Sequence, residues 1–134
     1  ERCISYLTIE HAGVIPRDLA QQFRGWWFGC DICQEVCPWN RFAPAGEDRR
    51  LSGSDHEADV LALSPDRFDA WFAGRAIRRL SWERFRRNLL VALWSIGRVD
   101  EIAPIIAEGL PLVRAQAEEL GIRPGRVERG QGCP

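Results

Sequence analysis

Four cysteines in the first part of the chain carry side chains able to bind a metal. Cys30, Cys33 and Cys37 follow the spacing C-x2-C-x3-C-P, and Cys3 lies 27 residues before Cys30. Because thiolates are soft ligands, such a set selects zinc, copper(I) or an iron–sulfur cluster. The fifth cysteine, Cys133, lies in a polar stretch near the other end of the sequence, where we expect a thiol with no part in this site.

The spacing favours an iron–sulfur cluster over zinc. A structural zinc site usually combines two closely spaced ligand pairs, and this sequence offers only the pair Cys30 and Cys33. His11 and His56 stand at no such spacing. Two alternatives stay open: a zinc-stabilised interaction module without catalysis, and a group of buried cysteines with no ligand role.

Bacterial ferredoxins carry the run C-x2-C-x2-C-x3-C-P, whose last cysteine ligates a second cluster. On that pattern Cys30 and Cys33 belong to one 4Fe–4S cluster and Cys37 to another, and Cys3 can supply a third ligand to the first. Each cluster still lacks ligands. We therefore expect the remaining cysteines upstream of Glu1, in the preceding part of a longer polypeptide.

Composition narrows the class of protein. With 134 residues and 46% hydrophobic residues, the chain is about one domain in size and can bury a core. Five cysteines, three of them close together, indicate a reduced, metal-binding, cytoplasmic protein more than a secreted disulfide framework. We expect no membrane association, because the sequence contains no apolar run long enough to span a bilayer.

Proline, serine and glycine signals predict a series of short helices and no strand of useful length. The expected helices cover residues 3–11, 15–25, 64–74, 81–97, 100–108 and 111–120. The predicted fold is therefore mainly α. Its expected parts are a partial ferredoxin-type iron–sulfur module (1–43), a polar linker (44–62), an α-helical region (63–121) and a disordered tail (122–134).

The basic residues are concentrated in one segment. Residues 75–98 hold seven arginines and one acid, although the whole chain has a net charge of -1. Arg75, Arg78 and Arg79 can share one face at helical spacing, and Arg86 and Arg87 follow on the first turns of the long helix. Such a cluster suits the phosphate oxygens of a nucleic acid. The alternative is a solvated basic face that balances the acidic first half of the chain.

Three stretches together resemble a known family. RCISYLTIEHAGVIPRDL and the following FGCDICQEVCPWNRFAP are similar to the iron–sulfur part of the epoxyqueuosine reductases. FAGRAIRRLSWERFRRNLLVALWSIG resembles the segment that follows it, and LPLVRAQA resembles the HEAT-like repeat near the C-terminus of that family. The resemblance covers most of residues 2–117 and implies the C-terminal portion of such an enzyme, with a HEAT-like helical region.

The resemblance implies an oxidoreductase that reduces epoxyqueuosine to queuosine in tRNA, with cobalamin and two 4Fe–4S clusters as cofactors. It implies that Cys3, Cys30 and Cys33 hold the cluster nearer the cobalamin, and that Cys37 joins the more distant one. Electrons from an external donor would pass through both clusters to the cobalt. The acid that protonates the substrate is expected upstream of residue 1, so this part alone should be inactive.

The same resemblance suggests further contacts. Asp31 and Thr8 are expected on the cobalamin side. The basic residues are expected to bind tRNA, namely Arg75, Arg78, Arg79, Arg86 and Arg87. The protein is expected to be a monomer.

Two stretches depart from the family pattern, the Gly25-Trp26-Trp27 entry and the ending AQAEELG. An electron-transfer subunit of ferredoxin type, with no tRNA role, is the alternative.

Overall fold

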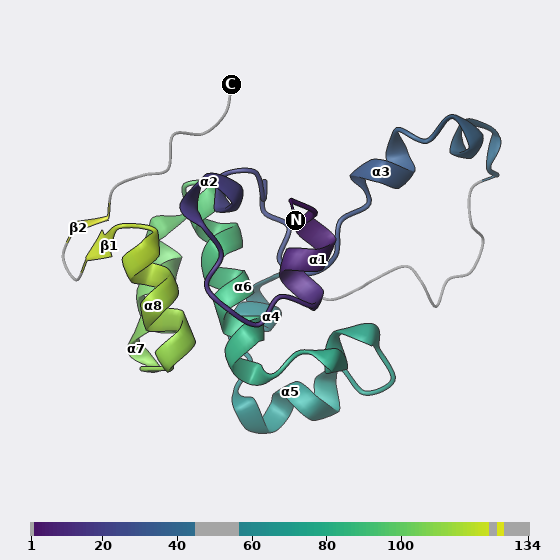
Figure 1. Cartoon of the computed structure of the whole chain (residues 1–134). Coiled ribbons are helices and arrows are strands. Elements are labelled where there is room, and N and C mark those ends of the chain that lie inside the picture. The colour runs from purple at the N-terminus through teal and green to yellow at the C-terminus, as the bar shows by residue number, and fades with distance from the viewer. Residues whose placement is uncertain (1, 45–56, 124–125, 128–134) are drawn as a thin grey trace.

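The computed structural model describes residues 2–44, 57–123 and 126–127 (Figure 1). As predicted, the described part is mainly helical. The elements of its first part are α1 (Ile4–Ile9), α2 (Arg17–Ala20), α3 (Ile32–Glu35) and the 3-10 helix η1 (Pro38–Phe42). Those of the second are α4 (Glu57–Leu61), α5 (Pro65–Trp71), η2 (Ala76–Arg79), α6 (Trp82–Ser95), η3 (Val99–Glu101), α7 (Ile102–Ala107) and α8 (Pro111–Glu119). None of the described helices is long and apolar enough to cross a membrane.

Local signals start and stop the longest helix where the sequence places them. At the start of α6, the Ser81 hydroxyl accepts a hydrogen bond from the Arg84 backbone N–H at 3.3 Å, which satisfies one of the free donors of the first turn. At its end, Gly97 adopts a φ of +77°. The backbone N–H of Arg98 then donates to the Leu93 carbonyl at 3.0 Å, as in a Schellman motif.

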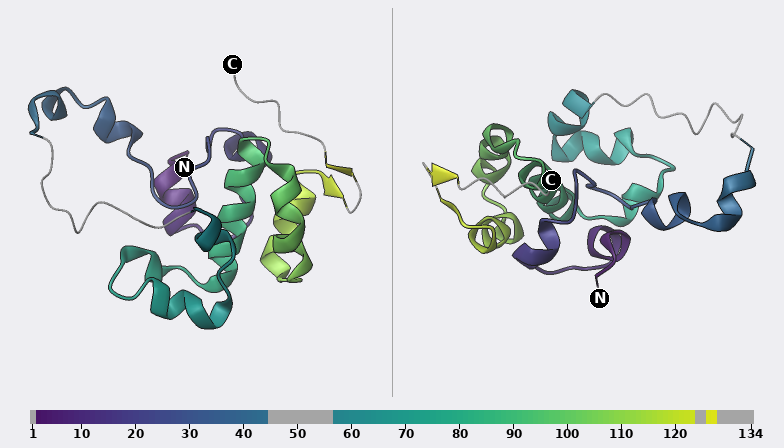
Figure 2. Two further views of the ribbon diagram at one scale, coloured as in Figure 1. Left: turned by 180° about the vertical axis from the view of Figure 1, so that it is seen from behind. Right: turned by 90° about the horizontal axis from the view of Figure 1, so that it is seen from above.

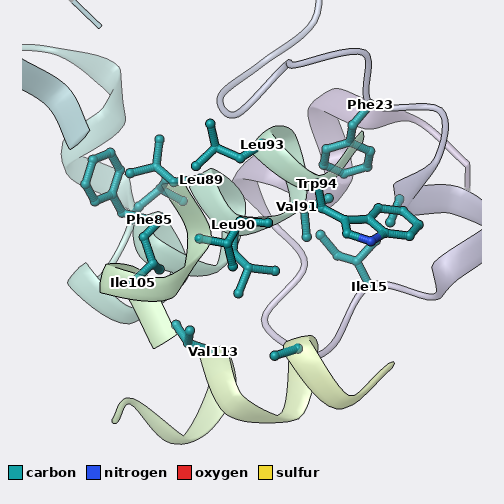
Figure 3. Close-up of a cluster of buried hydrophobic side chains, with 14 of the residues drawn as sticks. Ile15, Phe23, Phe85, Leu89, Leu90, Val91, Leu93, Trp94, Ile105 and Val113 are labelled. Atoms are coloured by element: carbon teal, nitrogen blue, oxygen red, sulfur yellow. The ribbon is translucent and has the colours of Figure 1, made fainter. Parts of the chain in front are cut away.

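Helix α6 forms the centre of the hydrophobic core. Every residue from Phe85 to Trp94 is buried, and α7 and α8 pack against this helix (Figure 3). The core also takes in two residues of the cysteine-bearing segment, Ile15 and Phe23, which lie close to Trp94 and are fully buried. The stretch before the cysteine cluster is therefore part of the same core as the helical region.

Buried hydrogen bonds fix that first stretch to the helices. The side-chain amide of Gln116 on α8 accepts from the Ile15 backbone N–H at 2.7 Å and donates to the Ile15 carbonyl at 2.9 Å. The Ser95 hydroxyl at the end of α6 accepts from the Gly25 N–H at 3.0 Å. These contacts satisfy backbone groups that form no secondary structure of their own, which is the usual requirement for burying irregular chain.

The segment that carries α3 and η1 extends away from the helices as an arm, which we define as residues 30–44. All three views of the ribbon show it projecting from the body (Figures 1 and 2). Its large apolar side chains are open to solvent in this chain: Val36 is 74%, Trp39 86% and Phe42 83% exposed. Exposed apolar surface of this size marks a contact region.

Two boundaries differ from the sequence prediction. The expected linker is too long, because Glu57–Leu61 forms α4 and Val60 is only 3% exposed; residues 45–56 lie outside the described residues. The expected tail begins too early. Strands β1 (Ile122–Arg123) and β2 (Arg126–Val127) pair antiparallel, and Ile122 packs in the core. The HEAT-like repeat stays a prediction.

Candidate iron-sulfur site and its hydrogen-bonded support

The four candidate ligands stand at or next to helix starts. Cys3 is the N-cap residue of α1, Cys30 directly precedes the N-cap residue of α3, Cys33 lies within α3, and Cys37 is the N-cap residue of η1. None of these thiols is buried and none forms a disulfide. A set of accessible, unpaired thiols is chemically suited to cluster ligation.

The described residues do not complete a metal site. Among them, no three His, Cys, Asp or Glu side chains are grouped closely enough to hold a metal ion. The ligand count agrees, because each 4Fe–4S cluster needs four thiolates, and two clusters need twice as many as these four cysteines supply. The donors present fit such clusters in chemistry and supply part of their ligand set.

Thr8 connects the helix of Cys3 with the loop of Cys30. The Thr8 hydroxyl donates to the Ile4 carbonyl at 2.9 Å and accepts a hydrogen bond from the Gly29 N–H at 3.0 Å. Its side chain is fully buried. The expected contact of Thr8 with cobalamin is therefore wrong, because the hydroxyl is already occupied inside the chain and has no open surface.

Asn88 on α6 holds the backbone of Thr8. Its amide nitrogen donates to the Thr8 carbonyl at 2.7 Å, and its amide oxygen accepts from Arg87 Nε and Nη2 at 3.1 and 2.8 Å. Both side chains are fully buried. Every polar atom of the Asn88 amide group therefore has a partner, a condition for a stable buried polar network.

Arg87 binds the end of α1 and the chain that follows it. Its guanidinium donates to the carbonyls of Leu7 at 3.0 Å, His11 at 2.9 Å and Gly13 at 2.6 Å. Burial, and secondarily the positive charge of Arg84, lower the pKa of Arg87 to about 10. The group therefore stays charged at neutral pH and is balanced by carbonyl dipoles.

Arg86 is also inside the fold. It is 3% exposed, donates to the Leu61 carbonyl at 3.0 Å and forms an ion pair with Glu108. Its guanidinium carbon lies 5.1 Å from the centre of the Trp82 ring. The predicted tRNA contacts of Arg86 and Arg87 are therefore wrong, because neither guanidinium is accessible to a phosphate.

The other three arginines are exposed. Arg78 pairs with Asp69 on α5, and Arg79 Nη2 lies 2.6 Å from Glu10 Oε1. The second pair connects η2 with the C-terminal end of α1. Arg75 is exposed as well. For these three, binding to tRNA stays a prediction.

Asp31 is also exposed. Its carboxylate makes no capping hydrogen bond at the start of α3. Its contact with cobalamin stays a prediction.

Sequence patterns did not predict three residues that hold the cysteine-bearing segment in place. Asn88, Ser95 and Gln116 each hold backbone of the cysteine-bearing segment. Asn88 carries a signal that could have been used, since it precedes the apolar run LLVALW, where a polar residue must find an internal partner. Ser95 and Gln116 lie among mixed residues and carry no comparable signal.

Comparisons with known proteins indicate an iron–sulfur domain in the first part of the chain. A family described as "4Fe-4S double cluster binding domain" matches residues 1–40. An epoxyqueuosine reductase from Pseudomonas aeruginosa is 40% identical over 124 residues, which is 89% of this chain and 33% of the relative. One from Cyclobacterium marinum is 44% identical over 90 residues, 66% of this chain and 29% of the relative. No solved structure matches the chain. This chain spans about a quarter to a third of the length of such relatives, and over that part it is similar to epoxyqueuosine reductases.

Proposed function

We propose that this chain is the part of an epoxyqueuosine reductase that completes two 4Fe–4S clusters and supports them with a helical core. The full enzyme would be an oxidoreductase that reduces epoxyqueuosine to queuosine in tRNA. The names of the relatives and the double-cluster match over residues 1–40 support the reaction and the clusters. Cobalamin, which would supply the reducing metal centre, and the path of electrons toward it are part of this proposal.

The hydrogen bond between Thr8 and Gly29 is the observation that supports our assignment of the four cysteines to two clusters. It fixes the loop of Cys30 to the helix that begins at Cys3, which supports the assignment of these two thiols to one cluster. Cys33 follows one helical turn after Cys30. Cys37 lies farther along the arm, before η1. We therefore place Cys3, Cys30 and Cys33 on one cluster and Cys37 on the other, with the missing thiolates supplied by residues outside this sequence.

The arm supplies a second kind of support. Its exposed apolar side chains, Val36, Trp39 and Phe42, adjoin the cysteines in sequence. In the complete protein we expect them to pack around the clusters and exclude water. The hydrophobic shell of a cluster influences its reduction potential.

The experiment is to measure iron, acid-labile sulfide and the electron paramagnetic resonance spectrum of the dithionite-reduced, anaerobically purified full-length protein. We expect iron and sulfide near eight of each, the sum of two four-iron clusters. Cys33→Ser and Cys37→Ser should each weaken a different cluster signal. Zinc without sulfide would overturn the proposal and favour a structural zinc module.

Binding of tRNA is tested separately. Neutralising the exposed arginines together, as Arg75→Gln, Arg78→Gln and Arg79→Gln, should weaken tRNA binding and reduce the slope of log affinity against log salt by up to about 3, since each lost phosphate contact lowers it by somewhat less than 1. The matched control is Arg67→Gln, which alters an exposed arginine that lies outside this group, on α5. An unchanged slope with intact clusters would favour an electron-transfer subunit with no tRNA role.

A further inference from the structure

Two ligands of the proposed first cluster lie far apart in sequence, and a single side chain joins their segments. Cys3 begins α1, and the Leu7 N–H donates to its carbonyl at 3.0 Å, so its backbone is fixed in the first turn. Thr8 follows on the same helix. Its hydroxyl accepts from the N–H of Gly29, the residue bonded to Cys30, at 3.0 Å. The backbone position of Cys30 relative to Cys3 therefore depends on this hydroxyl.

The loop needs that anchor because its backbone is not otherwise set by secondary structure. Gly29 has a φ of +68°, in the left-handed region, and a Cβ built on it would meet no atom within 4 Å. Trp27 and Phe28 pack against the core earlier in the loop, and the Thr8 hydroxyl fixes the backbone of Gly29, the last residue before Cys30. At the other end of the loop, Ser95 holds Gly25 in the same way.

Thr8 is itself held from α6. Asn88 donates to its carbonyl at 2.7 Å, and Arg87 donates to the carbonyl of the preceding Leu7 at 3.0 Å. Arg87 and Asn88 also bond to each other. All of these polar side chains are fully buried, so water does not compete for the contacts. A continuous path of hydrogen bonds thus runs from the core helix to the residue next to a cluster ligand.

We infer that Thr8, supported by Asn88 and Arg87, is a positioning residue that sets the geometry of Cys30 in the cluster it shares with Cys3. The inference rests on the proposed function, since it needs a cluster at these cysteines. It gives α6 a part in electron transfer beyond forming the helical core. A ligand loop that shifts changes the hydrogen bonds and solvent exposure around its cluster, and supporting contacts of this kind typically change metal affinity by roughly 10- to 100-fold.

The test compares Thr8→Val with Thr8→Ser in the full-length protein, purified anaerobically with its clusters. Valine keeps the shape of threonine and removes the hydroxyl, whereas serine keeps the hydroxyl. The readouts are the rate of iron release to a chelator, and the paramagnetic resonance signal and midpoint potential of each reduced cluster. Ser5→Ala, on the same helix, leaves the Gly29 contact intact and is the matched control.

With Thr8→Val we expect roughly 10- to 100-fold faster iron release from the Cys30 cluster, and an altered signal or potential for that cluster only. The Cys37 cluster serves as an internal reference in the same molecule. Thr8→Ser and Ser5→Ala should behave as the unaltered protein. Equal behaviour of Thr8→Val and the unaltered protein, or equal loss of both clusters, would overturn the inference.

Should Thr8→Val fail to fold, Asn88→Asp provides a second variant. It keeps an oxygen that accepts from Arg87 and removes the amide that donates to the Thr8 carbonyl. We expect the same cluster-specific change in a weaker form, and no change would count against the inference. An unaltered protein without iron and sulfide would overturn the proposed function itself, whereas intact clusters that ignore these substitutions would overturn only the role of Thr8.

Discussion

Replacing Arg87 by methionine should weaken the attachment of α1 to α6 by about 5 kcal/mol. Methionine fills much of the same volume but leaves four acceptors without their donor, the carbonyls of Leu7, His11 and Gly13 and the amide oxygen of Asn88. At about 2 kcal/mol for each buried acceptor left unpaired, the middle of the usual range, their loss costs about 8 kcal/mol. Removing a buried charge offsets part of this loss. The burial that lowers the pKa of Arg87 to about 10 corresponds to a penalty of about 3 kcal/mol on the charged form, at roughly 1.4 kcal/mol per pKa unit.

Hydrogen exchange followed by peptide mass spectrometry measures this effect locally, without treating a multidomain protein as two-state. Amides of the peptides covering 2–14 and 82–95 should exchange about 100-fold faster or more in Arg87→Met, since each factor of ten corresponds to roughly 1.4 kcal/mol. Arg87→Lys should fall in between, because a lysine keeps the charge and cannot reach all the acceptors. Arg67→Met, at an exposed arginine on α5, should exchange like the unaltered protein.

The pH dependence provides a further check. With a folded pKa of about 10, Arg87 stays protonated between about pH 6 and 8, so the difference between Arg87→Met and the unaltered protein should be constant there after correction for intrinsic exchange. Above about pH 10 the unfolded chain still holds a proton that the folded chain has lost, because the pKa of Arg87 is lower in the folded chain. The contribution of Arg87 to stability then rises with pH, and the difference widens. Unchanged exchange in Arg87→Met, or a difference that shrinks at high pH, would refute this reasoning.

Three further predictions concern single residues. Gln116→Leu leaves the Ile15 N–H and carbonyl unpaired and should speed exchange around residue 15 by roughly tenfold or more, at about 1–3 kcal/mol per orphaned group; a slowed or equal rate would count against this contact. The pKa of Glu101 is lowered, mainly by its hydrogen bond from Arg98, so this carboxylate stabilises the fold above its ordinary pKa of 4.5 and the effect is lost as pH falls through the lowered value. Acid unfolding of Glu101→Gln and of the unaltered protein should therefore converge at low pH, and divergence on acidification would contradict the pairing. Cys133→Ser should leave iron and sulfide content unchanged, and a fall in either would give this thiol a ligand role.

Local sequence signals predicted most of the helices. The capping serine at residue 81 and the proline after Ser64 open helices where expected, and Gly97 ends the longest one. These signals act through the backbone of a few neighbouring residues, so they can be recognised without the tertiary structure. The cysteine spacing is local in the same sense, and it led to the kind of site that the family match supports.

The support of that site depends on contacts between distant residues. Thr8 and Gly29 are 21 residues apart, and Ile15 and Gln116 are 101 apart. A hydroxyl or an amide can bond to any backbone group that the fold brings near, and neither residue type shows in sequence which group that will be. Thr8 was therefore given a place beside the cofactor, whereas the structure buries it one residue away from a candidate ligand.

The arginines show how a charge pattern and an apolar pattern must be weighed together. Arg78 and Arg79 lie in the short η2 segment, which presents them to solvent, whereas Arg86 and Arg87 lie on α6. That helix continues as LLVALW, which is apolar on all sides, and a helix that is apolar all round is buried. A charged residue one turn before such a run must then enter the core with its partners. Within the basic segment, the exposed arginines that lie close in sequence are those of residues 75–79. A nucleic acid that binds them would contact η2 and the adjoining end of α1, which the pair Arg79 and Glu10 holds together.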